Sequence, residues 1–221
     1  MNQCVPMFVR VFSLAAALCI GWWSVPAGAV EATPMHEDSV HVRTWNRFAD
    51  DLLALHQRRL ARREVRTEEH IGGYADISRF YREVSYYDAD SGRLLSRIRW
   101  EREHPDRVHV IEVFVRDEQG RVVRDYTAAY LPYYRNAPSQ TLISLHRYHG
   151  DLHAFRTFDA SGARIFERCQ GTWQGRELDF MLDEDAIYEQ EGEPDSVMES
   201  PQYKACFGDL QTTAEGYLKP H

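Results

Sequence analysis

The chain has 221 residues, and its 26 basic and 34 acidic side chains give it a formal net charge of −8. With 43% hydrophobic and 27% charged residues, it has the composition of a globular protein, and its length fits one domain with appendages. The negative charge argues against general nucleic-acid binding, because nucleic acids are held by basic surfaces.

The first 29 residues predict a secretory signal peptide. Arg10 precedes an apolar run over residues 11–20, Pro26 ends any helix, and Ala27 and Ala29 supply the small residues of a cleavage site. Cleavage after Ala29 sends the protein to the periplasm or outside the cell. The alternative is an uncleaved anchor, because residues 11–30 carry no charge and are just long enough to span a bilayer. No later stretch predicts a membrane span.

The cysteines agree with export. Cys4 and Cys19 lie in the signal peptide, which leaves Cys169 and Cys206 as an even pair in an oxidising compartment. We therefore expect a disulfide between these two residues, tying the C-terminal segment to the main body. A redox role is disfavoured, because the chain contains no Cys-x-x-Cys motif.

A helix is predicted from Thr44, after a loose leader over residues 30–43. Apolar side chains recur at steps of three and four and build one apolar face. These residues are Trp45, Phe48, Leu52 and Leu55. The far end is basic, as the helix macrodipole favours, and a membrane-docking patch is the alternative interpretation. The basic residues are Arg58, Arg59, Arg62, Arg63 and Arg66.

From Ile77 the apolar spacing changes to two, which predicts β-strands. About eight short strands follow one another up to residue 182, separated by turns in which Gly follows Asp or Ser. No helical pattern of ten or more residues separates them, so neighbouring strands are expected to pair antiparallel. Residues 44–182 therefore predict an α+β, mostly β domain. In it the helix packs on a curved antiparallel meander, an open half-barrel or barrel-like sheet.

The C-terminal part differs in composition. Residues 183–200 carry eight acidic side chains and no Lys or Arg, which predicts a solvated connector without the ordered spacing of a calcium loop. Residues 201–221 form a last segment, fastened by Cys206, with a short helix expected over 201–218.

Three histidines surround one predicted hairpin. If Gly150 and Asp151 form a two-residue loop, His146 and His153 become diagonal neighbours on one sheet face, and His149 points to the other. Two such imidazoles could bind a metal ion if a third ligand came from elsewhere. The simpler interpretation is that they are half-exposed polar residues of ordinary strands.

Aromatic residues on the predicted strands form the second candidate site. Core packing is their ordinary role, but on an open curved sheet they would line a groove for a lipid, a peptide or a partner strand. The groove candidates are Tyr86, Trp100, Phe114, Tyr126, Tyr130, Phe155 and Phe158.

Standard catalytic motifs are absent, although this does not exclude an enzyme whose active site assembles from scattered residues. We favour a non-enzymatic protein and expect no cofactor. A helix followed by a meander in an exported chain resembles the layout of periplasmic half-barrel carriers of lipids and lipoproteins. We therefore expect a periplasmic protein that holds an apolar ligand, such as a lipid, or an envelope protein on its curved sheet. The alternatives are a metal-handling protein using His146 and His153, and a hydrolase whose scattered site draws on the acidic stretch.

Overall fold

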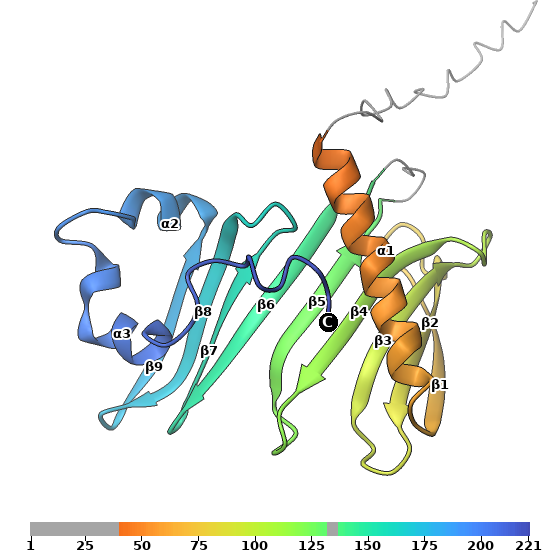
Figure 1. Cartoon of the computed structure of the whole chain (residues 1–221), viewed down its shortest axis with the longest axis horizontal. Helices are drawn as coiled ribbons and strands as arrows, with labels where there is room; N and C mark the ends of the chain where they lie inside the picture. The colour runs from red at the N-terminus through yellow and green to blue at the C-terminus, as the bar shows by residue number, and fades with distance from the viewer. Residues whose placement is uncertain (1–39, 132–136) are drawn as a thin grey trace, which may run out of the picture. The chain divides into compact units, whose positions relative to one another are not determined.

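The computed structural model describes residues 40–131 and 137–221. These form one sheet and three α-helices, with a single 3₁₀ turn, η1 (Figure 1). The helical segments are α1 (Val40–Leu60), α2 (Glu184–Gln190), η1 (Val197–Glu199) and α3 (Pro201–Phe207). The strands are β1 (Val65–Gly72), β2 (Tyr81–Asp88), β3 (Leu94–Glu101), β4 (Val108–Arg116), β5 (Val122–Ala129), β6 (Gln140–His149), β7 (Leu152–Phe158), β8 (Arg164–Trp173) and β9 (Arg176–Asp183).

The strands lie in the sheet in sequence order, and every neighbouring pair is antiparallel. The sheet is open, with β1 and β9 as its two edges. This confirms the predicted mostly β, α+β class with an antiparallel meander. Short turns make this order possible. At the β6–β7 hairpin, for example, Gly150 adopts a φ of 57°, which a residue with a side chain rarely adopts.

One face of the sheet carries the core. The apolar stripe of α1, centred on Phe48 and Leu52, packs on the central strands against Val113, Tyr126 and Ile143. Towards β9 the same face is covered by α3 and the C-terminal segment, which runs across the front of the strands (Figure 1). In the part of the chain that the structure describes, none of the helices packs on the other face, which we call the open face.

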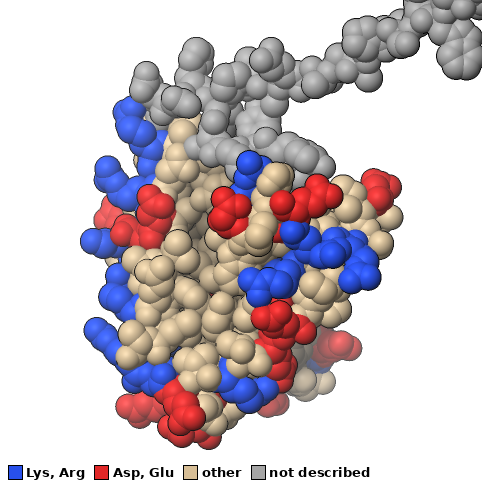
Figure 2. All heavy atoms as spheres, turned by 90° about the vertical axis from the view of Figure 1, so that its right-hand side faces the viewer, with Lys and Arg blue, Asp and Glu red and all other residues tan. Residues whose placement is uncertain are grey.

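Strand β1 was not predicted from the sequence. Residues 58–66 were expected to be the basic end of a helix, but α1 ends at Leu60 and Arg66 lies on β1. This strand is exposed over most of its length, so it shows no alternation of apolar and polar residues. Charged residues on an edge strand also oppose pairing with other chains. Seen from the side of β1, acidic and basic side chains lie beside one another around an uncharged area (Figure 2).

Three boundaries also differ from expectation. Helix α1 already includes Val40, so the end of the predicted leader is helical, whereas residues 1–39 lie outside the described ones. The acidic stretch is not simply a connector, because the Asp183 side chain accepts a hydrogen bond from the backbone N–H of Ala186 and begins α2. The last helix, α3, ends at Phe207 with Gly208 as its C-cap, well short of the expected end near residue 218.

Candidate functional site

The predicted aromatic groove is filled by the protein itself. Of the seven candidates, five lie in or against the core beneath α1, where Tyr126 and Phe158 are 0% exposed. The other three of these five are Tyr86, Trp100 and Tyr130. The strand register turns Phe114 and Phe155 to the open face instead, so the seven residues do not share one surface.

The histidine hairpin has the predicted register, with His149 opposite Leu152 and His146 opposite Phe155. His146 and His153 meet on the open face, where Nδ1 of His146 lies 3.0 Å from Nε2 of His153. His149 is exposed and is not part of the pair. Burial lowers the pKa of His153, and the neighbouring His146 lowers it further.

Sequence reasoning missed the carboxylate beside this pair. Asp125 of β5 lies diagonally across from His146, and its Oδ2 is 2.6 Å from His146 Nε2. Because a carboxylate only accepts, His146 donates from Nε2. Period-two alternation in β5 does put Asp125 on the face opposite Tyr126, but only the pairing of β5 with β6 brings it to His146.

A third protein ligand for a metal is not found. Among residues 40–131 and 137–221, no group of three or more His, Cys, Asp or Glu side chains is arranged to hold a metal ion. The site therefore provides at most two imidazole ligands, and Asp125 accepts a hydrogen bond from one of them, His146.

A buried polar cluster joins the sheet to the C-terminal part. Arg156 of β7 and Glu167 of β8 are 2% and 0% exposed, and the Arg156 Nε donates to Glu167 Oε1. Tyr203 of α3 donates to Glu167 at 2.8 Å and accepts from Arg156 at 3.0 Å. Arg156 also donates to the backbone oxygens of Leu210 and Gln211. Four N–H donors of this guanidinium thus connect β8, α3 and the C-terminal segment.

Next to this cluster lies a recess of about 630 Å³. It is bounded by the segment from α2 to η1, by α3 and by the start of the C-terminal segment. This volume falls within the range of about 300–1,000 Å³ that is typical of small-molecule sites. The floor includes Arg156 and Arg164, and the apolar part of the lining comes from Met198, Phe207 and Leu210.

Arg164 is the unusual residue of this recess. A bulge in the β7–β8 pairing sets Arg164 opposite Phe158, so its side chain turns to the covered face and is only 10% exposed. Its polar contacts are all long: 3.7 Å to Glu167 Oε1, 3.4 Å to Glu191 Oε1 and 3.8 Å to Met198 Sδ. Simple alternation from Glu167 would place Arg164 on the open face, which is why sequence reasoning missed it.

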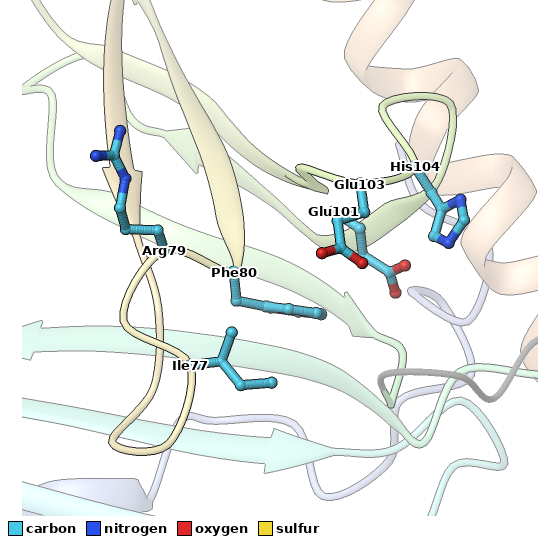
Figure 3. A pocket seen from close by; sticks show the side chains of 6 residues that line it. All are labelled: Ile77, Arg79, Phe80, Glu101, Glu103 and His104. Carbon is cyan, nitrogen blue, oxygen red and sulfur yellow. The ribbon is translucent and has the colours of Figure 1, made fainter. Parts of the chain in front are cut away.

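A second pocket, of about 110 Å³, lies near the start of β2. Ile77 and Phe80 lie at one side of it, Glu101, Glu103 and His104 lie at the other, and Arg79 points away (Figure 3). This volume is below the range typical of small-molecule sites, so the pocket holds a few waters at most.

The disulfide predicted from the cysteine count is present. Cys169 of β8 and Cys206 of α3 are joined with a Cα–Cα distance of 5.9 Å, and both are fully buried. The bond fastens α3 over the strands that form the floor of the recess.

Comparisons with protein-family models, curated proteins and solved structures find no match to this chain. Within the described segments, none of the helices combines the length and the apolar character needed to cross a bilayer. The case for a function therefore depends on the sites themselves.

Proposed function

We propose that this protein is an exported, non-enzymatic binding protein whose ligand is a small organic anion with an apolar part. The ligand would bind in the recess beside Arg164, rather than on the sheet face that α1 fills. The observation that carries the proposal is a nine-tenths-buried guanidinium whose ion pairs with Glu167 and Glu191 are long, at 3.7 Å and 3.4 Å.

The two buried arginines of the recess support an anion, although its exposed lining also carries Glu191, Glu193 and Glu199 beside Lys204. Arg156 and Arg164 are both nearly buried there, while Glu167 is the buried carboxylate that they share. Arg156 holds that carboxylate closely, and Glu191, the other carboxylate near Arg164, is 70% exposed. A buried charge is costly unless it is paired and hydrogen-bonded. A carboxylate or phosphate bound to the planar fork of Arg164 would supply a closer and bidentate partner.

The rest of the lining supports an apolar part in the same ligand. Met198, Phe207 and Leu210 lie in the recess beside the two arginines. Methionine adapts readily to ligands of different shape. A short acyl or aromatic group joined to an anionic head would therefore match both halves of the lining.

The test compares probes that share a tail and differ in their head group. Octanoate, octyl phosphate and neutral 1-octanol would be titrated into the wild-type protein and the Arg164→Gln variant by calorimetry. We expect at least one anionic probe to bind more tightly than octanol. We also expect the substitution to weaken that binding about 10- to 150-fold, the value of one charge-assisted hydrogen bond of about 1.5–3 kcal/mol.

Arg168→Gln is the matched control. Arg168 lies on the same strand but is 38% exposed and pairs with Asp179. Its loss should leave probe binding unchanged. The proposal would be refuted if neither octanoate nor octyl phosphate bound more tightly than octanol, or if the wild type and Arg164→Gln bound the anionic probes equally. Comparing octanoate with octyl phosphate tells a carboxylate site from a phosphate site.

Export is part of the proposal. The predicted signal peptide lies among residues that the structure does not describe, and the Cys169–Cys206 disulfide supports an oxidising compartment. Intact mass analysis of the mature protein should show a chain that begins at Val30. A chain that keeps residues 1–29 would instead support an anchor.

A further inference from the structure

The open face carries a site of different chemistry. Two half-buried imidazoles, His146 on β6 and His153 on β7, face each other there, and this face is the one that α1 and α3 leave uncovered. From the geometry of this pair we infer a binding site for a divalent transition metal ion, with copper(II) bound more tightly than zinc.

The separation of the two nitrogens suits a shared metal. Nδ1 of His146 and Nε2 of His153 are 3.0 Å apart. With metal–nitrogen bonds of about 2.0 Å, two ligands lie about 2.8 Å apart at a right angle and about 3.3 Å apart at a tetrahedral angle. The observed distance falls between these values, but the two rings are nearly parallel with their centroids 5.2 Å apart, so the two nitrogens point at each other in a hydrogen bond. To share one ion, both rings would have to turn away from this line, and the ion would replace that hydrogen bond.

Asp125 strengthens this inference, because it sets which nitrogen of His146 is free. The carboxylate accepts the Nε2 proton at 2.6 Å, which leaves Nδ1 of His146 with a lone pair that accepts from Nε2 of His153. His153 would therefore bind the ion as its other neutral tautomer, with the proton on Nδ1. Metal-binding histidines almost always donate their second N–H to a carboxylate, carbonyl or water in this way. Asp125 is thus a positioning residue for the proposed site.

The choice of copper follows from the number of ligands. The protein supplies two nitrogens, and water would fill the other positions, so the site has no rigid geometry with which to select zinc. Affinity should then follow the general order in which copper(II) exceeds the other divalent first-row metals. Neutral imidazole is a good ligand for this ion.

The experiment titrates the mature chain with Cu²⁺ and, separately, with Zn²⁺. Calorimetry should show one Cu²⁺ site that is tighter than the Zn²⁺ site, and electron paramagnetic resonance of the copper complex should show coupling to nitrogen. We expect His146→Ala and His153→Ala each to weaken Cu²⁺ binding at least tenfold. Asp125→Asn should weaken it about 10- to 100-fold, the usual effect of losing such a carboxylate.

His149→Ala is the matched control, because His149 belongs to the same hairpin but is exposed and outside the pair. It should bind copper like the wild type, and circular dichroism should show that every variant is folded. Absence of a Cu²⁺ site in the wild type, or unchanged binding in both His146→Ala and His153→Ala, would overturn the inference. Since the recess lies on the covered face, failure of the copper test leaves the anion proposal standing.

Discussion

His56 shows how a single buried side chain couples stability to pH. It lies on the buried side of α1, 6% exposed, with Nδ1 2.8 Å from Ser96 Oγ and its ring edge-on to Tyr86. Burial lowers its pKa from 6.5 to about 4, because the charged imidazolium would lose its hydration there. Burial also lowers the pKa values of His109 and His153.

The lowered pKa of His56 makes the folded protein less stable at acidic pH. Between pH 6.5 and 4 the unfolded chain binds a proton at His56 that the folded chain refuses, so stability falls as the pH falls. At about 1.4 kcal/mol per pKa unit, we expect the unfolding free energy to fall by about 3 kcal/mol between pH 6.5 and 4 because of His56. Urea unfolding measured at several pH values would show this loss.

The variant His56→Gln isolates the contribution. Its unfolding free energy should fall less steeply between pH 6.5 and 4 than that of the wild type. His70→Gln serves as the control, because His70 is exposed on the edge strand β1. If the profile of His56→Gln ran parallel to the wild-type profile, His56 would not be the group responsible.

At the scale of single elements, α1 is held by its apolar stripe. Leu52 is 0% exposed and belongs to the cluster that joins α1 to β4, β5 and β6. Leu52→Ala should lower the unfolding free energy by about 2–5 kcal/mol, because it removes buried methyl groups and leaves a cavity. Chemical denaturation measures this loss.

The comparison for α1 is Arg58→Ala, on an exposed position of the same helix. Exposed substitutions of this kind usually change stability by less than about 0.5 kcal/mol. Equal effects of the two substitutions would mean that α1 does not depend on packing against the sheet.

At the scale of the whole molecule, the disulfide cross-links the sheet to the C-terminal helix α3. It links β8 to α3 across 37 residues of chain that include β9 and α2. Replacing both Cys169 and Cys206 by Ala should lower the unfolding free energy by about 3–4 kcal/mol, because the unfolded chain gains the freedom of the opened loop.

Reductant provides the internal check on this prediction. It should lower the thermal midpoint of the wild type and leave that of the double variant unchanged. A wild type whose thiols are shown to be free, but whose midpoint has not moved, would contradict the stabilising role. Arg156 would then be the main tie of the C-terminal segment, through its bonds to Leu210 and Gln211.

Local patterns in the sequence were enough to predict several features of the fold. Period-two alternation and short turns predicted antiparallel strands in order, and the two-residue loop at Gly150 set the register that joins His146 to His153. The pair Cys169–Cys206 followed from counting, because the other two cysteines belong to the predicted signal peptide. The strand order and the hairpin register depend on neighbours in the chain, and the disulfide depends on the number of cysteines left after the signal peptide.

Tertiary structure decided which sheet face is covered and what the candidate sites contain. Alternation separates two faces but does not say which one a helix will bury, so core residues such as Tyr126 and Phe158 were also candidates for a groove. Arg164 turned to the covered face because of a bulge, and Asp125 met His146 through the pairing of separate strands. Such contacts depend on the packing of distant segments, which the local order of residues does not encode.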